Sequence, residues 1–261
     1  MRITQCNTVL KFFKPRVLKK YGLIECTDPS LPCVFWGMYA VQSRKLISHQ
    51  GFAVVVWCGS DAMSALKNRS FVQFLLQNTG RIFHIAISNF IERDLKRAGL
   101  PYKALPLLSV ETNDCHVMPR GRSLYHYGTK SSETDMKYNY PMAKEVSLKT
   151  GLPLIVAHKD SFSRGYLINT VYRECFLGLR LLTHDGLSNS MVELGLCGRN
   201  VIHNGNLPNS INFRDIYDII AAVRYEFAHR REENTQIAID VKKFINIDEN
   251  WLNTEYYENN E

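Results

Sequence analysis

A short polar segment between two apolar runs carries the residues best suited to binding chemistry. Asp185 and Glu193 lie eight residues apart, and Ser188, Asn189 and Ser190 stand between them at the expected start of a helix. Backbone N–H groups at a helix start lack helical partners and suit a phosphate. Carboxylates accept hydrogen bonds from the vicinal hydroxyls of a sugar or ribose. This combination predicts a nucleotide-sugar site.

A structural role for the same residues stays open. The sequence Ser190-Met-Val-Glu193 has the spacing of a capping box, in which Glu193 bonds back to the start of its own helix. Spacing alone does not separate this role from ribose binding.

Two arginines near this segment are candidates for holding a negative charge. Arg180 is embedded in an apolar run, and a buried guanidinium needs a partner such as Asp185 or a phosphate. Arg199 follows the helix in a Gly-Arg turn. We therefore expect both arginines to contribute to anion binding.

The elements that position this segment form a βαβ unit. Residues 176–182 are apolar and bounded by a turn, as a buried strand is. Residues 183–190 read as a loop, 191–196 as a short helix and 200–203 as the start of the next strand. Ligands of such units lie at the carboxyl ends of the strands and at the helix N-terminus.

Other turns that follow apolar runs are candidate sites of the same kind. Asp61 follows the apolar run 53–57, where a carboxylate would act as a general base or bind acceptor hydroxyls, unless it is an N-cap. Gly37-Met-Tyr39 is a similar turn. In Gly128-Thr-Lys130, the lysine would neutralise a diphosphate unless it is a solvated surface residue.

Strands and helices alternate along most of the chain. Apolar runs at 31–36, 52–57, 82–86 and 105–108 are separated by helical patterns, which indicates a parallel sheet. Residues 109–122 lack periodicity and read as a linker, and a second α/β series follows it. We predict an α/β fold with two Rossmann-like α/β/α domains facing a cleft.

The expected domain boundaries follow from this alternation. Residues 1–115 would form the N-terminal acceptor-side domain, within which 1–30 carry no clear pattern, and 116–236 the donor domain. Residues 237–261 would form a C-terminal helix and tail.

The central segment resembles a known family. Asp185-Gly-Leu-Ser-Asn-Ser-Met-Val-Glu193, followed by Leu194-Gly-Leu-Cys-Gly-Arg-Asn-Val-Ile202, is similar to the donor-site signature of GT-B fold glycosyltransferases of the group 1 or family 4 type. Arg180-Leu-Leu-Thr-His-Asp-Gly186 looks like a subset of polysaccharide-assembly members. The resemblance implies transfer of a sugar from a nucleotide-sugar to a glycan or glycolipid hydroxyl, with no metal or other cofactor. Family members are longer, and the first domain here is unusually short. The resemblance also implies that the C-terminal helix and tail at 237–261 cross back to the first domain, with Trp251 and Leu252 as anchors.

The resemblance also implies roles for the matched residues. Glu193 would hold the ribose, and Asp185 would contact the transferred sugar at a position where the family more often has Glu. The expected catalytic residues are Asp61, Asp185 and Arg180. The expected donor-binding residues are Gly128, Thr129, Lys130, His184, Gly186, Leu187, Ser188, Asn189, Ser190, Glu193 and Arg199, and the expected acceptor-side residues are Gly37, Tyr39 and Ser60.

Composition limits the alternatives. Hydrophobic residues at 45% and charged residues at 22% of 261 residues are ordinary globular values. No run is long and apolar enough to cross a bilayer, and the N-terminus lacks the apolar core of a signal peptide, so we expect a cytoplasmic protein. Seven scattered cysteines without a C-x-x-C pair argue against a zinc site or a disulfide framework.

The net charge of +7 suggests an anionic partner. Residues 9–21 alternate apolar and basic side chains. This segment either lies on an anionic membrane as a peripheral contact or covers a sheet edge. Aromatic and basic residues are not interleaved elsewhere, so we do not expect nucleic acid as a partner.

Two other functions remain as alternatives. The short first domain fits a catalytically degenerate GT-B-like module that binds nucleotide without turnover. The net charge fits a basic nucleic-acid-binding protein, whose binding would depend steeply on salt. The absence of P-loop, nucleophile-elbow and G-x-G-x-x-G motifs argues against NTPases of that class, hydrolases of that class and typical NAD enzymes.

Overall fold

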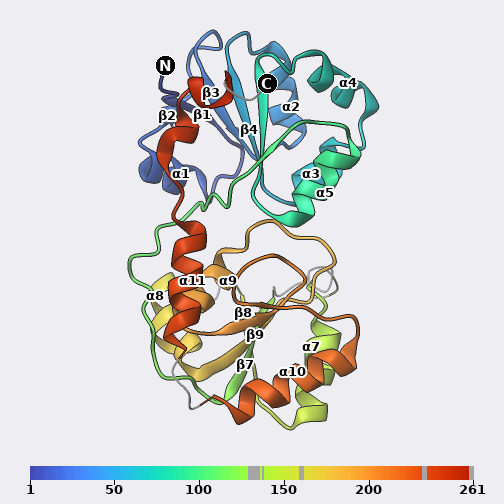
Figure 1. Cartoon of the computed structure of the whole chain (residues 1–261), viewed down its shortest axis with the longest axis vertical. Coiled ribbons are helices and arrows are strands. Elements are labelled where there is room, and N and C mark those ends of the chain that lie inside the picture. The colour runs from blue at the N-terminus through green and yellow to red at the C-terminus, as the bar shows by residue number, and fades with distance from the viewer. Residues whose placement is uncertain (129–135, 137, 159–161, 231–233, 259–261) are drawn as a thin grey trace. The chain divides into compact units, whose positions relative to one another are not determined.

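The chain folds into two compact units (Figure 1). The computed structural model describes residues 1–128, 136, 138–158, 162–230 and 234–258. Unit 1 comprises Met1–Glu111, His184–Leu187 and Ile245–Glu261, and unit 2 comprises Thr112–Thr183 and Ser188–Phe244. The first boundary therefore follows residue 111 and not 115, and the C-terminal segment of unit 1 begins at 245 and not 237.

Unit 1 is built on a six-stranded parallel sheet in the order β2-β1-β3-β4-β5-β6. The strand order changes direction between β1 and β3, and ligands of α/β sheets commonly bind at the carboxyl ends of strands beside such a point. The strands are β1 (Gln5–Asn7), β2 (Ile24–Glu25), β3 (Cys33–Trp36), β4 (Ala53–Trp57), β5 (Ile82–Ala86) and β6 (Lys103–Ala104).

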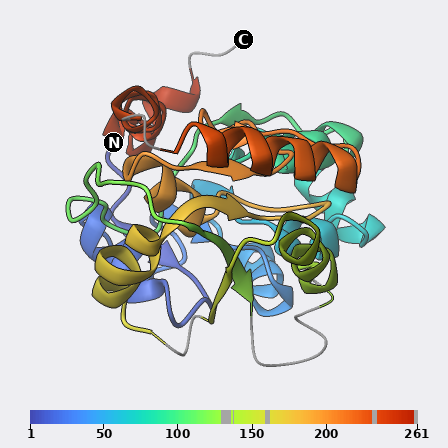
Figure 2. The same ribbon diagram turned by 90° about the horizontal axis from the view of Figure 1, so that it is seen from below.

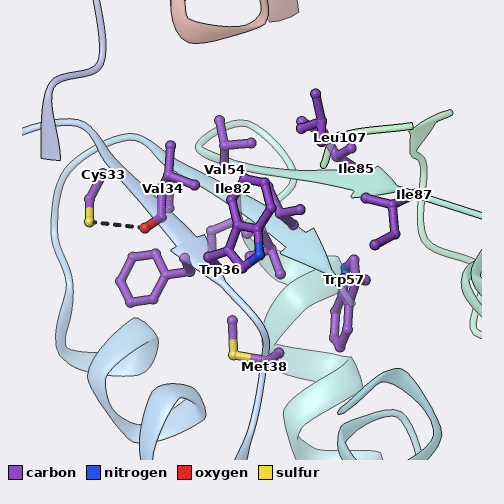
Figure 3. Packing of buried hydrophobic residues seen from close by; sticks show 14 of the residues in the cluster. Cys33, Val34, Trp36, Met38, Val54, Trp57, Ile82, Ile85, Ile87 and Leu107 are labelled. Atoms are coloured by element: carbon purple, nitrogen blue, oxygen red, sulfur yellow. Dashed lines mark hydrogen bonds between the residues drawn. The ribbon is translucent and has the colours of Figure 1, made fainter. Parts of the chain in front are cut away.

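The core of unit 1 lies on both faces of these central strands. Every residue of β3 and β4 is buried, because helices cover both faces of a parallel sheet. Figure 3 shows the side chains of Val34, Trp36, Val54 and Ile82 gathered over neighbouring strands. The connecting helices are α1 (Lys14–Tyr21), α2 (Ala40–Ser48), α3 (Ser60–Ala65), α4 (Arg69–Gln77) and α5 (Asn89–Arg97).

The C-terminal segment completes the core of unit 1. It contains the 3₁₀ helix η2 (Glu249–Leu252) and the short helix α12 (Glu255–Glu258). Trp251 is 1% exposed, and its ring packs edge-on against Tyr21 at 5.2 Å between ring centroids. Trp251 and Leu252 are thus buried in unit 1, although they follow the whole of unit 2 in the sequence.

Unit 2 is a five-stranded parallel sheet in the order β11-β10-β9-β7-β8, whose direction changes between β7 and β9. Helices α7 and α10 pack side by side (Figure 1, Figure 2). The strands are β7 (Ser123–Gly128), β8 (Leu154–His158), β9 (Cys175–Leu179), β10 (Asn200–Ile202) and β11 (Ser210–Ile211). The helices are α7 (Tyr140–Thr150), α8 (Arg164–Tyr166), the π-helix η1 (Leu167–Tyr172), α9 (Asn189–Leu196), α10 (Ile216–Ala228) and α11 (Thr235–Ile245).

Two parallel α/β sheets with interleaved helices confirm the predicted fold class. The strand expected at 105–108 is instead β6 at Lys103–Ala104. Helix α1 is the crossover between parallel strands β1 and β2, and its residues Val17 and Tyr21 are buried in unit 1. Among the described residues, no helix combines the length and the apolar character needed to cross a bilayer.

Candidate functional site

The turns after β3 and β4 bring the three expected acceptor-side residues together in unit 1. Gly37 adopts φ +81°, which favours glycine, and its N–H donates to the Val56 carbonyl at 2.9 Å. The Tyr39 hydroxyl lies 3.3 Å from the Ser60 hydroxyl. Tyr39 is half-buried and Ser60 is exposed, so a ligand hydroxyl can approach this pair.

Asp61 is buried beneath the same turns and accepts hydrogen bonds from their backbone. Its Oδ2 accepts the Met38 N–H at 2.8 Å, and both oxygens accept the Cys58 N–H at 3.0 and 3.1 Å. Burial raises the pKa of this carboxyl, and the backbone N–H groups oppose that shift. Because the side chain is 0% exposed, the structure contradicts a direct contact with an acceptor hydroxyl. The N-cap of α3 is Gly59, so the alternative role of Asp61 as N-cap is also wrong.

Residues His184–Leu187 belong to unit 1, apart from the rest of the expected donor motif. A Cβ on Gly186 would lie 1.9 Å from the Cys58 carbonyl oxygen, so this backbone approach requires glycine. The Ser88 hydroxyl donates to the Asp185 carbonyl at 3.0 Å. The Asp185 carboxylate accepts the Gly186 N–H at 2.9 Å. The segment thus lies at the carboxyl ends of β4 and β5.

His184 and Leu187 hold the two ends of this segment. His184 Nε2 lies 2.7 Å from an Asp94 carboxylate oxygen, and its ring is 5.8 Å from that of Phe90. Leu187 packs against the apolar core of unit 1. The four residues expected at the donor site therefore lie together, with Tyr39 and Ser60, in unit 1.

In unit 2, Arg180 stands at the carboxyl end of β9. It follows the strand and is half-buried, which corrects the expectation of an arginine embedded in a strand. Its guanidinium carbon lies 5.3 Å from the Tyr127 ring centre and 4.9 Å from that of Tyr138, as in cation–π contacts. Gly128 ends the neighbouring strand β7, whereas Thr129 and Lys130 lie outside the described residues.

The N-terminus of α9 contains the three small polar residues of the motif. Ser188 is the N-cap and makes no side-chain bond to the helix backbone, and its hydroxyl lies 3.0 Å from that of Ser190. Asn189 opens the helix, so Ser190 lies inside it. The capping-box interpretation is therefore wrong, because neither Ser190 nor Glu193 has the required position. All three residues are half-buried at the positive end of the helix dipole.

Glu193 is held by two side chains that sequence reasoning did not identify. The carboxylate is 5% exposed. Its Oε1 accepts from Arg164 Nε at 2.8 Å, and its Oε2 accepts from the Tyr172 hydroxyl at 3.0 Å. Burial raises the pKa of Glu193, and Arg164 and Tyr172 oppose that shift. No motif spacing links residues 164 and 172 to 193, so only the fold could reveal this cluster.

Arg199 does not contribute to anion binding. The residue is 0% exposed, and burial lowers its pKa to about 10. Its guanidinium nitrogens donate to backbone carbonyls of unit 2, so the charged group lies inside that unit. The carbonyls are those of Tyr172, Cys175, Met118, Pro119 and Cys197.

Across the described residues, no three histidine, cysteine or acidic side chains come together as metal ligands would.

Comparison with solved structures places these two units among glycosyltransferase folds. Sucrose-phosphate synthase from Thermosynechococcus elongatus is similar, with a TM-score of 0.63 and 11% identity over 90% of this chain and 73% of that one. A mutant of S. aureus TarM in complex with fondaparinux, α-GlcNAc-glycerol and UDP gives a TM-score of 0.60 and 9% identity over 87% and 55%. The pneumococcal O-GlcNAc transferase GtfA in complex with UDP and GlcNAc gives 0.51 and 15% over 96% and 60%.

These likenesses show that the chain has the GT-B glycosyltransferase fold, which confirms the resemblance at the level of fold. The chain spans 55% of the length of TarM. No protein-family model and no curated protein sequence matches it.

Proposed function

We propose that this chain is a glycosyltransferase that moves a sugar from a nucleotide-sugar to a hydroxyl of a glycan or glycolipid. One observation carries the proposal. Glu193 stands on α9, the helix that begins at Ser188–Ser190. Its carboxylate accepts hydrogen bonds from two side chains of another helical segment. An anion-binding helix end and an oriented carboxylate on one short helix suit the phosphates and the ribose of one nucleotide.

The diphosphate is the leaving group of this reaction and needs positive stabilisation. Ser188, Asn189 and Ser190 supply the helix end, and Arg180 supplies a charge at the end of β9. Gly128, the last residue of β7, contributes on the other side of the point where the strand order reverses. In this proposal no metal ion assists the leaving group.

The acceptor-side role falls to the exposed hydroxyls of unit 1. Tyr39 and Ser60 bind an acceptor hydroxyl, and Gly37 gives the chain room to turn there. His184 and Asp185 contact the transferred sugar. Asp61 has no catalytic role in this proposal, because its carboxylate is buried under backbone N–H groups.

A cytoplasmic location with peripheral membrane contact through residues 9–21 is part of the proposal. Phe12 is 55% exposed and carries the Arg16 guanidinium 4.2 Å from its ring centre. Lys11 and Lys19 are also exposed. An exposed aromatic ring among cations suits an anionic lipid surface. Sedimentation with anionic but not neutral vesicles, lost in Phe12→Ser, is the expected result.

A thermal-shift screen against UDP, GDP, ADP, CMP and TDP tests the donor site. We expect one nucleotide to stabilise the wild type, by about 2.7 kcal/mol at a concentration of 100 times its Kd. Glu193→Gln should lose most of this gain. Glutamine is chosen over alanine because it retains an acceptor for the buried Arg164 charge.

Glu174→Gln is the matched control, because Glu174 is an exposed acid of the same unit. Its nucleotide response should equal that of the wild type. A wild type that no nucleotide stabilises would remove the main support for a nucleotide-dependent enzyme.

A catalytically degenerate nucleotide-binding module is the second candidate. The burial of Asp61 favours it, since the one acid expected as a base on the acceptor side cannot reach a substrate. The two candidates separate in one assay, in which a protein that binds a nucleotide-sugar is incubated with glycan acceptors. Release of free nucleotide supports the enzyme, and binding without release supports the module.

A further inference from the structure

The two carboxylate oxygens of Glu193 are held by separate donors from one helical segment. Arg164 opens α8, and Tyr172 closes the π-helix η1 that follows it. We propose that Arg164 and Tyr172 are positioning residues that aim the Glu193 carboxylate at a vicinal diol. The inference rests on the proposed function, because the diol would be that of the nucleotide ribose.

The geometry leaves one accepting direction on each oxygen. A carboxylate has about four lone-pair sites, two on each oxygen. Arg164 Nε occupies one site on Oε1 at 2.8 Å, and the Tyr172 hydroxyl occupies one on Oε2 at 3.0 Å. The remaining sites lie on different oxygens of one carboxylate. Two neighbouring hydroxyls can each donate to one of them.

The charge of the cluster supports the same role. Glu193 lies in a buried setting that raises its pKa, so the ionised form is disfavoured without a cation beside it. Arg164 supplies that cation and also forms an ion pair with Asp114. An ionised carboxylate accepts hydrogen bonds on both oxygens, whereas a protonated one turns one oxygen into a donor.

The π-helix places Tyr172 where its hydroxyl can reach Glu193. Helices with this wider turn are rare and are often found at functional sites. Tyr172 is 0% exposed, and its ring packs edge-on against Tyr125 at 5.3 Å between centroids. The ring is thus fixed by packing, which holds its hydroxyl 3.0 Å from Glu193 Oε2.

A ribose-discrimination assay tests the proposal. The nucleotide found in the screen and its 2′-deoxy counterpart are titrated into the wild type, Tyr172→Phe and Arg164→Lys. The wild type should prefer the ribonucleotide by about tenfold, which corresponds to one lost hydrogen bond to a charged group. Tyr172→Phe removes only the hydroxyl and should reduce the preference to less than about threefold.

Arg164→Lys keeps the charge but cannot pair with Glu193 and Asp114 in the fork geometry of arginine, so it should show an intermediate preference. Both variants should bind the deoxynucleotide as the wild type does. That affinity shows that they are folded, and a purely structural role would leave the preference unchanged. Tyr166→Phe and Arg173→Lys are controls from exposed positions of the same segment.

The outcomes distinguish the proposed donor site from the positioning role of Arg164 and Tyr172. If Glu193→Gln loses the ribose preference while Tyr172→Phe and Arg164→Lys retain it, the donor site stands and the positioning role is overturned. If Glu193→Gln retains the preference, or if no nucleotide binds, the proposed function fails and this inference fails with it. A double variant Tyr172→Phe with Glu193→Gln should lose no more preference than Glu193→Gln alone.

Discussion

Three buried ionisable side chains, Asp61, Arg199 and Glu193, differ in the partners that hold them. Asp61 and Arg199 hydrogen-bond only to the backbone, and this arrangement fixes turns and strand ends. Glu193 is bonded to side chains that stand on another helical segment. In our proposal, the second arrangement lets the carboxylate bind a ligand.

The sequence could not separate these groups. Arg180 and Arg199 both stand beside apolar runs. The guanidinium of Arg180 lies beside two tyrosine rings, whereas that of Arg199 donates only to carbonyls. The difference depends on which carbonyls the fold leaves without partners, and these come from residues about 80 positions away in the chain. Residue type and spacing do not show which of these carbonyls an arginine will reach.

Asp61→Ala should lower the free energy of unfolding by about 3 kcal/mol, because the N–H groups of Met38 and Cys58 would remain buried without acceptors. Asp61→Asn should cost less, since its amide oxygen still accepts. Urea unfolding followed by tryptophan fluorescence measures both changes. Ser60→Ala, at an exposed neighbour, should change stability by less than about 0.5 kcal/mol.

A catalytic role for Asp61 would show as a different result. The Asp61→Asn protein would then have wild-type stability and normal nucleotide binding but transfer no sugar.

His84 should make unit 1 sensitive to acid. Trp57 Nε1 donates to His84 Nδ1 at 3.3 Å, and burial lowers the pKa of His84 to about 3. Below pH 6.5, the usual pKa of histidine, His84 binds a proton in the unfolded chain but stays neutral in the folded chain. Stability should therefore fall as the pH drops from 6.5 towards 3, by up to about 1.4 kcal/mol per pH unit.

His84→Asn is the variant for this test, because asparagine retains an acceptor for Trp57 and does not titrate. The difference in unfolding free energy between wild type and variant should change with pH along this slope. A pH-independent difference would mean that His84 is protonated equally in both states.

At the scale of elements, apolar runs in the sequence predicted most of the strands. Strands that are polar or very short were not predicted. The run 53–57 is apolar because both faces of β4 are covered, and it was predicted to within a residue. β1 has the sequence Gln-Cys-Asn and β11 has two residues, so neither has a pattern to read. The π-helix was expected only as a short helix, because no sequence signal distinguishes the wider turn.

The candidate site segment was predicted from the sequence as one loop, and its division between the two units was not predicted. His184–Leu187 follows a strand of unit 2 and precedes a helix of unit 2, yet it is part of unit 1. The contact that places it there is a backbone approach of Gly186 to Cys58. A glycine in a polar loop is explained equally well by a turn, so the approach was not foreseen.

Gly186→Ala should displace this segment, because the new Cβ would lie 1.9 Å from a backbone oxygen that cannot swing away. We expect a loss of about 2 kcal/mol in unit 1 stability, typical of overpacking, and faster proteolysis within residues 184–187. Gly80→Ala is the control, since no heavy atom lies within 4 Å of its new Cβ. Equal behaviour of the two variants would contradict the close approach.

At the scale of the whole molecule, the three tryptophans of the chain, Trp36, Trp57 and Trp251, all lie in the core of unit 1. Tryptophan fluorescence therefore reports the unfolding of unit 1 alone, whereas far-ultraviolet circular dichroism reports both units. This contrast allows each unit to be followed in the intact chain.

We predict that the stabilising nucleotide raises the midpoint of unit 2 unfolding. This is the transition that circular dichroism detects and tryptophan fluorescence does not. The proposed ribose and phosphate contacts belong to unit 2, and a ligand stabilises the part of a protein that binds it. Urea titrations with and without the nucleotide measure the shift. A shift confined to the fluorescence transition would place the nucleotide on unit 1.

The position of Trp251 also affects the order of folding during translation. Domains of a nascent chain usually fold from the N-terminus onward. Here unit 1 begins the chain, but its core receives Trp251 and Leu252 only after all of unit 2 has been synthesised. On a ribosome stalled within a C-terminal extension, so that residue 244 has just left the exit tunnel, the chain should therefore carry a folded unit 2 and an unfinished unit 1. Until the last residues emerge, the apolar face that Trp251 covers is a surface for chaperones to shield.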